Sequence, residues 1–289
     1  MKVTRLPDVQ RRPRRVAVGT FDGVHLGHRE VIRGADTVLT FDPHPARVVA
    51  PHAAPRLLTT LERKAALIAS LGVEELVVVP FDREFASRSA QQFVDDVLVG
   101  ALRATLVSVG ENFRFGHRAR GDAALLRADD RFETREVELL EVDGEIVSSS
   151  HIRGLLLGGA VEYAGRLLGE PFAMAGEVVR GDARGRELGY PTANIVPDDA
   201  YVTPGHGVYA CAADGNRPAA VSIGVRPTFD TGRGELVEAY LIDFDGDLYG
   251  TRLELSFLKR LRGEKRFGSV DALVAQMARD VEAARAVCS

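Results

Sequence analysis

The sequence predicts an α/β doubly wound N-terminal domain followed by a small antiparallel β-barrel domain that ends in a helix. Three observations support this prediction. The first half alternates short apolar runs with amphipathic segments, which is the pattern of a parallel sheet covered by helices. The second half is rich in strand-like segments joined by turns. With 289 residues, the chain is long enough for one large domain or two ordinary ones, and two is the more usual outcome.

The composition is that of a globular protein without a polyanionic partner. Hydrophobic residues make up 45% and charged residues 27% of the chain, and the formal net charge is −4. We therefore expect no nucleic-acid partner and no membrane partner. The chain has neither a membrane-span pattern nor the apolar core of a signal peptide, so we expect a cytoplasmic protein. Four arginines at residues 11–15 are interpreted as a solvated lead-in to the first strand, and Cys211 and Cys288 are too few for a disulfide framework or a zinc site.

Four apolar runs in the first half are predicted to be buried parallel strands, because they are short, rich in valine and bounded by turn residues. They span residues 15–19, 37–41, 76–81 and 106–110. Capping boxes at residues 59–62 and 89–92 predict the starts of two helices. Strands that alternate with helices in this way indicate a doubly wound α/β domain.

Residues 19–28, GTFDGVHLGH, follow the first apolar run, where a strand passes into a helix. In a parallel sheet, ligands lie beyond the carboxyl ends of the strands, and free amides at a helix start favour phosphate. His25 and His28 lie on one side of a turn, and Gly27 between them lets a phosphate approach. Donors aimed at a polyphosphate would stabilise charge on its α-phosphate and on the leaving pyrophosphate. For either histidine alone, a solvated imidazole is the competing interpretation.

This string resembles the HxGH signature of the nucleotidyltransferase superfamily and, as GxFDGVHxGH, the bacterial riboflavin kinase and FAD synthetase family. GENFRFG at residues 110–116 is similar to the family's GENFxFG, which implies that Asn112 contacts ligand. SSSHIR at residues 148–153 is similar to the family's SSTxIR, with serine in place of threonine at position 150. The resemblance implies a phosphate cradle from Ser149, Ser150 and Arg153. Helix capping by the serines is the competing interpretation.

The segment between His28 and Thr40 departs from the family pattern, because it is shorter than the resemblance implies. It still accommodates a crossover between parallel strands with a helix of about two turns. A shorter first helix could reshape or uncover the nucleotide pocket.

Around Gly169 the sequence becomes strand-rich, and we place a domain boundary there, with domains at residues 1–169 and 170–289. The expected strands span residues 172–179, 208–212, 219–224, 236–244 and 252–258, which indicates a small β-barrel. Ser269 is expected to cap a terminal helix. The apolar stripe of that helix is expected to pack on the barrel and consists of Val270, Leu273, Val274, Met277 and Val281.

Residues 181–194, GDARGRELGYPTAN, combine glycines and arginines in a plausible phosphate-facing loop. Thr192 and Asn194 point the same way in an extended chain and offer two oxygens suited to Mg²⁺, although a surface turn is the competing interpretation. Glu238 is a carboxylate in an otherwise apolar strand. A phosphoryl transfer needs a group that accepts the proton of the attacking hydroxyl, which Glu238 could supply unless it simply faces solvent.

The first run resembles the GDxxGRxLGxPTAN signature of riboflavin kinases, which implies that Gly181, Arg186, Thr192 and Asn194 bind the nucleotide and its Mg²⁺. The string that begins at Val237 is similar to the family's VExxxLDFxxDLYG, whose glutamate is the general base, and this implies the role for Glu238. Together the resemblances imply a bifunctional enzyme. It would convert riboflavin to FMN with one ATP, then FMN to FAD with a second ATP, releasing pyrophosphate.

Two alternatives stay open. In the first, the chain is a riboflavin kinase alone. Its short first helix has then left the N-terminal domain without adenylyl transfer, as a scaffold or regulatory flavin binder. The chain could instead be a nucleic-acid-associated protein, as the arginine cluster and the HxGH string of some tRNA synthetases suggest. The absence of a KMSKS-like motif and the net charge of −4 argue against that alternative. Protein partners are unknown from the sequence.

Overall fold

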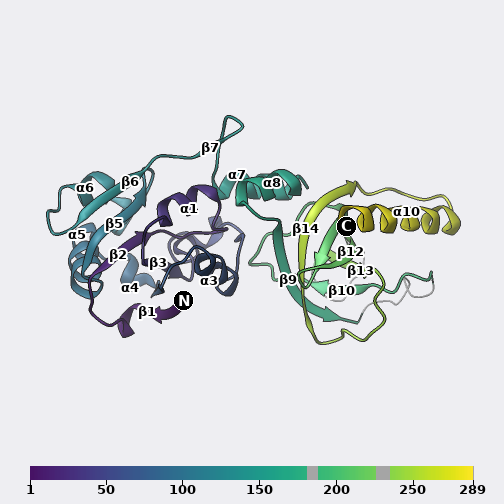
Figure 1. The fold of residues 1–289 in the computed structure, drawn as a ribbon, viewed down its shortest axis with the longest axis horizontal. Coiled ribbons are helices and arrows are strands. Elements are labelled where there is room, and N and C mark those ends of the chain that lie inside the picture. The colour runs from purple at the N-terminus through teal and green to yellow at the C-terminus, as the bar shows by residue number, and fades with distance from the viewer. Residues whose placement is uncertain (181–187, 226–234, 289) are drawn as a thin grey trace. The chain divides into compact units, whose positions relative to one another are not determined.

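The computed structural model describes residues 1–180, 188–225 and 235–288. The chain divides into two compact units, residues 1–149 and 150–289. The first unit contains a parallel sheet with helices, and the second contains a closed barrel with helices (Figure 1). The doubly wound domain and the antiparallel barrel predicted from the sequence are both confirmed.

The sheet of the first unit has six parallel strands in the order β1-β4-β3-β2-β5-β6. Its four inner strands are the four apolar runs predicted from the sequence: β2 (Arg14–Val18), β3 (Thr37–Asp42), β4 (Glu75–Pro80) and β5 (Ala104–Gly110). The outer strands β1 (Lys2–Arg5) and β6 (Glu133–Val137) were not predicted. Edge strands lack neighbours on one side and tolerate charged residues, so they do not form apolar runs.

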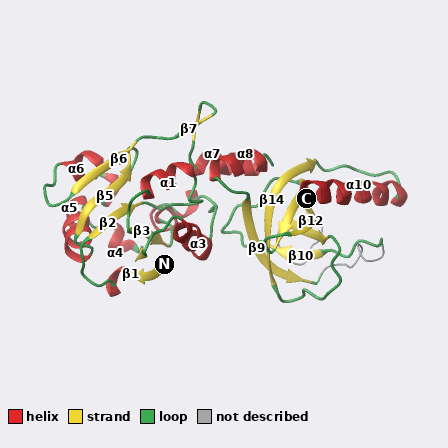
Figure 2. Ribbon diagram, viewed as in Figure 1, coloured by secondary structure: helices red, strands yellow, loops and turns green. Residues whose placement is uncertain are grey.

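Helices cover both faces of this sheet (Figure 2). Successive strand residues point to opposite faces, so Val16 and Val18 pack in one core while Ala17 packs in the other. The Ala17 core includes residues of α1 (Leu26–Ile32) and α3 (Leu61–Ser70). The opposite core includes residues of α5 (Ala90–Gln92), the π-helix η3 (Phe93–Ala101) and α6 (Ala123–Arg127). The shorter elements are η1 (Leu6–Asp8), α2 (Pro45–Val49), η2 (Pro51–Ala53), α4 (Arg83–Ala86), η4 (His117–Ala119), β7 (Glu141–Val142) and β8 (Glu145–Ile146).

One of the two expected capping boxes is present. Ser89 accepts a hydrogen bond from the Gln92 amide, and the Gln92 side chain accepts one from the Ser89 amide, as predicted. The box expected at residues 59–62 is wrong. Thr60 caps α3 by accepting from the Arg63 amide at 3.1 Å, whereas the Thr59 hydroxyl is used by a distant part of the chain.

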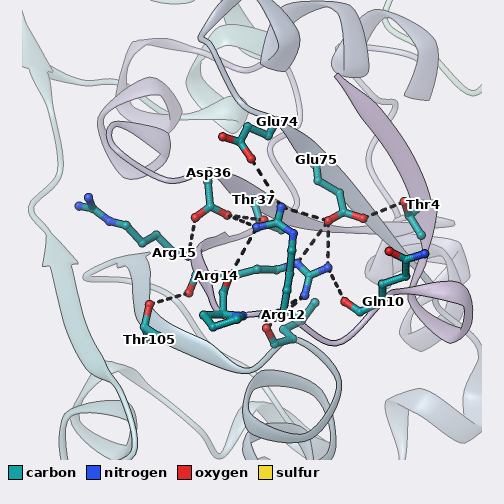
Figure 3. A network of polar contacts seen from close by, with 12 residues as sticks. Thr4, Gln10, Arg12, Arg14, Arg15, Asp36, Thr37, Glu74, Glu75 and Thr105 are labelled. Carbon is teal, nitrogen blue, oxygen red and sulfur yellow. Dashed lines mark hydrogen bonds and ion pairs between the residues drawn. The ribbon is translucent and has the colours of Figure 1, made fainter.

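The prediction that the arginine cluster is a solvated lead-in is wrong for Arg14, which begins β2 and is 1% exposed. Its Nη2 lies 3.0 Å from the Glu75 carboxylate, which also accepts a hydrogen bond from the Thr4 hydroxyl at 2.9 Å (Figure 3). Arg12, which is more exposed, lies 3.4 Å from the same carboxylate. The network joins β1, β2 and β4, so a buried ion pair ties three strands together.

The second unit is a closed barrel in the order β10-β13-β12-β11-β14-β9. Its strands are β9 (Phe172–Val179), β10 (Ala193–Val196), β11 (Gly207–Ala213), β12 (Arg217–Val225), β13 (Glu235–Leu241) and β14 (Arg252–Arg262). Five of them were predicted, although β13 ends at Leu241 and not at residue 244. The four-residue β10 was not predicted, because so short a strand leaves little pattern.

Along the chain, helices come before and after the barrel strands. Helices α7 (Ser149–Leu157) and α8 (Val161–Leu168) precede the barrel, and α8 packs on β9 and β14. Helix α10 (Val270–Cys288) follows it, packs on β11, β12 and β14, and is capped by Ser269 as predicted. The expected inward stripe of α10 is wrong for Val270, which is 61% exposed.

The secondary structure changes character where the sequence suggested a boundary. Helix α8 ends with Gly169 as its left-handed C-cap, at φ 81°, and β9 begins at Phe172. The compact second unit starts earlier, at Ser150. A division into functional domains at 169/170 stays a prediction. Among the described residues, no helix is long and apolar enough to span a membrane.

Candidate active sites

The sheet order places the HxGH turn at a topological switch point. From β2 the chain moves to β3 and β4 on one side, then returns to β5 on the other side of β2. Ligands of open α/β sheets bind at such a point, beyond the carboxyl ends of the strands. The turn that carries His25 follows β2, and the exposed Asn112 follows β5. The topology therefore brings both predicted segments to the end of the sheet where the strands have their carboxyl termini.

The turn between β2 and α1 has a strained backbone. Phe21, Gly23 and Val24 have φ values of 47°, 88° and 42°, so two residues with side chains are left-handed. Each such residue costs on the order of 1–3 kcal/mol and persists only where its surroundings hold it. The side chains of Phe21 and Val24 are buried in the core, which supplies part of that support.

Two side chains hold the start of this turn. The Thr20 carbonyl accepts hydrogen bonds from Thr40 Oγ1 at 3.1 Å and from Lys64 Nζ at 2.8 Å. Thr40 lies in β3 and Lys64 in α3. The carboxyl end of β2 is therefore fixed both by its neighbouring strand and by a helix on one face of the sheet.

Three further hydrogen bonds hold the middle of the turn. The buried Asp22 carboxylate accepts from the Leu58 amide at 2.8 Å. The Asp22 carbonyl accepts from Ser149 Oγ at 2.9 Å, and the Gly23 amide donates to Thr59 Oγ1 at 3.2 Å. The hydroxyl of Ser149, which the sequence assigned to phosphate binding, is thus engaged in locking the turn.

The two histidines of the turn lie against each other. Their rings stack with centroids 3.5 Å apart, and the ring of Phe21 meets that of His28 edge-on at 5.3 Å. His25 is the N-cap of α1, and its Nδ1 accepts from the His28 amide at 3.3 Å. Neutral His25 consequently carries its proton on Nε2.

His28 lies in an environment that disfavours its charged form. Its Nδ1 is buried and has no hydrogen-bond partner within the described part of the chain. Burial, with the charges of His25 and Lys64, holds the pKa of His28 well below its usual range. At neutral pH His28 is therefore an uncharged imidazole with one N–H donor.

Lys64 is a residue of this site that the sequence reasoning missed. Its side chain is 7% exposed, and burial lowers its pKa against the opposing charges of Asp22 and Asp42. The available signal was its position, because Lys64 is four residues before the buried Ile68 and so lies on the apolar face of α3. A lysine on an inward face indicates a function or a buried partner.

Ser150 and Arg153 fall in the second unit, on α7. Arg153 Nη1 donates to Ser150 Oγ at 3.3 Å, within the same helix. The structure brings His25, His28 and Ser149 to one turn, and the assignment of Ser150 and Arg153 to the phosphate site stays a prediction.

A cavity of about 1190 Å³ lies in the second unit. Thr192, Asn194 and Glu238, the three predicted kinase residues within the described chain, all line it. The apolar part of its wall includes Leu273 and Met277 of α10. Gly181 and Arg186, also predicted to bind nucleotide, lie outside the described residues.

The barrel register brings two predicted residues face to face. Strands β10 and β13 are antiparallel, and Asn194 is directly opposite Glu238. Side chains paired in this way have Cβ atoms about 4.5–5.5 Å apart. Asn194 is 8% exposed and Glu238 is half-buried, and both face the cavity. An amide oxygen and a carboxylate therefore converge beside Thr192, which precedes β10.

The ion pair between Arg262 and Asp280 holds α10 beside this cavity, and the sequence reasoning missed it. Arg262 Nη2 lies 2.8 Å from Asp280 Oδ2, and both residues line the cavity. Gln276 Nε2 also donates to Asp280, at 2.8 Å. This network joins the last barrel strand to the helix that carries Leu273 and Met277.

Family models match both units. A model described as FAD synthetase matches residues 8–151, and one described as riboflavin kinase matches residues 168–288. The bifunctional riboflavin kinase/FMN adenylyltransferase of Escherichia coli (strain K12) is 39% identical over 287 residues, which cover 93% of this chain and 91% of the relative. The protein of the same name from Bacillus subtilis (strain 168) is 37% identical and covers 93% of this chain and 90% of the relative.

A solved structure matches the fold along the whole chain. It is described as a macrolide-efflux protein from Streptococcus pneumoniae, is 33% identical, has a TM-score of 0.88, and covers 99% of each chain.

Proposed function

Because this chain belongs to the family of bifunctional riboflavin kinase/FMN adenylyltransferases, we propose how its two sites divide two consecutive reactions. The enzyme phosphorylates riboflavin to FMN with ATP, then transfers an adenylyl group from a second ATP to FMN, giving FAD and pyrophosphate. One observation carries this function over the kinase-only alternative. Each family model covers a unit that has its own polar site.

In the kinase step, the terminal ribityl hydroxyl of riboflavin attacks the γ-phosphorus of ATP. The new O–P bond forms as the bond from the γ-phosphorus to its bridging oxygen breaks, and ADP leaves. The hydroxyl proton passes to Glu238, which acts as general base. The half-buried carboxylate on the cavity wall, opposite Asn194, supports this role.

We propose that Thr192 and Asn194 hold a Mg²⁺ ion in the kinase site and that Gly181 and Arg186 contact the nucleotide. The donor set fits, because a hydroxyl and an amide supply the oxygen ligands that Mg²⁺ prefers. Mg²⁺ is usually held by one or two protein groups together with substrate phosphates. Bound Mg²⁺ would neutralise charge on the β- and γ-phosphate oxygens.

In the adenylyl-transfer step, a phosphate oxygen of FMN attacks the α-phosphorus of ATP. The bond from that phosphorus to the α–β bridging oxygen breaks, and pyrophosphate leaves. We assign His25 and His28 to donate hydrogen bonds to the phosphates, with Asn112, Ser149, Ser150 and Arg153 as further ligand contacts. The neutral state of His28 supports a donor role without proton transfer.

Neither reaction requires a macromolecular partner. Both steps consume ATP, and we propose the cytoplasm as the compartment where the enzyme works.

A time course of flavin products tests this function. Purified protein would be incubated with riboflavin, excess ATP and Mg²⁺, and flavins would be separated by chromatography. We expect FMN first and FAD later, with pyrophosphate released in step with FAD. FMN without FAD would support the kinase-only alternative, and no product would contradict the assignment of both sites.

A further inference from the structure

Lys64 is a buried cation beside the histidine turn that the reaction as described so far does not use. It lies in the first turn of α3, on the face that also buries Leu67 and Ile68. Its Nζ emerges from this apolar face and donates to the carbonyl of Thr20 at 2.8 Å. A lysine ammonium loses its hydration when buried, so its placement needs an explanation beyond packing.

The Thr20 carbonyl is the last point of support before the strained turn. Residue 20 follows β2, and the left-handed residues Phe21 and Val24 come next. Thr40 Oγ1 donates to the same carbonyl at 3.1 Å, and this bond comes from the neighbouring strand. Lys64 supplies the support from α3, so its loss would remove one of the two side-chain donors to this carbonyl.

The charge of Lys64 acts on His28, in addition to the larger effect of burial. Among the charged and titratable groups around His28, His25 on the same turn and Lys64 from α3 both lower its pKa. Burial lowers the pKa of Lys64, and the negative charges of Asp22 on the turn and Asp42 at the end of β3 raise it. A bound polyphosphate would supply negative charge to the same cluster.

We propose that Lys64 is a positioning residue for adenylyl transfer. Its hydrogen bond holds the backbone that carries His25 and His28. Its ammonium places a positive charge beside the histidine pair, where it attracts the negatively charged polyphosphate of ATP. This inference rests on the proposed adenylyl transfer at this turn.

Lys64→Met tests both parts of this role, because it removes the donor and the charge while keeping the apolar stem. We expect kcat/KM for FAD formation from FMN and ATP to fall about 100-fold, as for loss of one preorganised donor. Riboflavin phosphorylation in the same preparation should not change. The acid limb of the pH profile of FAD formation should move to higher pH, because the pKa of His28 rises when the neighbouring positive charge is removed.

Lys64→Gln separates the charge from the hydrogen bond, since its amide can still donate to Thr20. We expect the acid limb to shift as in Lys64→Met, with a smaller loss of kcat. Circular dichroism and thermal unfolding would check that the first unit stays folded. If Lys64→Met unfolds it, the pH profile of Lys64→Gln decides the charge effect.

Thr105→Val is the matched control, because the Thr105 hydroxyl donates to the Arg14 carbonyl at the opposite end of β2, at 3.1 Å. We expect it to leave FAD formation and its pH profile unchanged. Folded Lys64 variants with wild-type FAD formation and an unshifted acid limb would overturn the inference. A wild-type enzyme that makes no FAD would instead contradict the proposed function.

Discussion

The histidine turn of the first unit and the Asn194–Glu238 pair of the barrel are held in place by different means. The turn has a strained backbone. Its support comes from distant side chains: Thr40 donates to Thr20 from 20 positions away in sequence, and Ser149 donates to Asp22 from 127 positions away. The barrel pair is set by strand register, because β10 and β13 place the two side chains opposite each other. One site depends on tertiary support from outside, and the other on the regular ladder to which its residues belong.

This difference predicts how each site responds to mutation. Changes that never touch substrate should damage the turn, because its geometry needs several distant donors. The barrel pair should respond mainly to changes in the residues that line the cavity.

The largest expected effect is on the barrel pair itself. Glu238→Gln removes the proposed base but keeps the shape of the side chain, and we expect FMN formation to fall about 1000-fold, within the range for general base catalysis. FAD formation from added FMN should stay at the wild-type rate. Glu177→Gln, an exposed carboxylate of the same barrel, is the control and should change neither rate. Equal loss of both activities in Glu238→Gln would contradict separate sites.

The next largest effect concerns the buried Arg14–Glu75 ion pair within the sheet of the first unit. Burial raises the pKa of Glu75, but hydrogen bonds from Arg14 and Thr4 and the charges of Arg14 and Arg12 outweigh it, so its pKa lies below the ordinary value of 4.5. Because the folded-state pKa is lowered, the stabilisation is present above pH 4.5 and is lost as pH falls through the lowered value. Glu75→Gln should cost about 3 kcal/mol at neutral pH, since it leaves Arg14 without its counter-charge.

The measurement for Glu75→Gln is unfolding of the first unit by denaturant between pH 3 and pH 7. The free energy of unfolding of the wild type should fall more between pH 7 and pH 3 than that of the variant, because the variant lacks the Glu75 carboxylate. Glu74→Gln is the neighbouring control, because the Glu74 side chain is 71% exposed, and it should cost little. Similar losses for the two variants would show that the buried network adds nothing.

A comparable effect on rate is expected at the histidine turn. His28→Ala should lower FAD formation from FMN about 100-fold, because a preorganised donor is lost from the phosphate site. Riboflavin phosphorylation should be unaffected. His52→Ala, an exposed histidine of η2, provides the control for general effects of removing an imidazole. Normal FAD formation by His28→Ala would remove the histidine pair from the mechanism.

The smallest expected effect tests local structure alone. Ser89→Ala should destabilise the first unit by about 1 kcal/mol, because the N-cap of α5 is lost. Thermal unfolding measures the loss of stability. Ser70→Ala, at the C-terminal end of α3, is the comparison. The Ser70 hydroxyl donates to the Leu67 carbonyl within its own helix, so its loss should matter less. If Ser70→Ala costs as much as Ser89→Ala, the cap has no special effect.

The features predicted from sequence were those set by nearby residues. The Ser89 box was predicted because both its hydrogen bonds are local, and the inner strands because burial on both faces makes their runs apolar. Thr192, Asn194 and Glu238 were assigned to one kinase site because the motifs that they match are long and specific, and all three line the same cavity. The short helix expected after His28 is α1, although it begins earlier, at Leu26.

The features that were missed depend on contacts between distant residues. Arg14 was expected in solvent because its partner Glu75 is 61 positions away. The cap of α3 was assigned to the wrong threonine because Thr59 is used by Gly23. Lys64 was missed because its partner, the Thr20 carbonyl, is 44 positions away in sequence. Such residues have at most a weak local signal, because tertiary burial gives them their role.

The central claim is that one chain carries two separate sites, and a mixing experiment tests it most directly. Glu238→Gln and His28→Ala proteins would each be incubated with riboflavin, ATP and Mg²⁺, alone and together, and FAD would be measured by chromatography. We predict that neither variant alone makes FAD at more than a small fraction of the wild-type rate. We predict that the mixture does, because FMN released by His28→Ala is adenylylated by Glu238→Gln. A mixture that makes no more FAD than the separate variants would contradict the account.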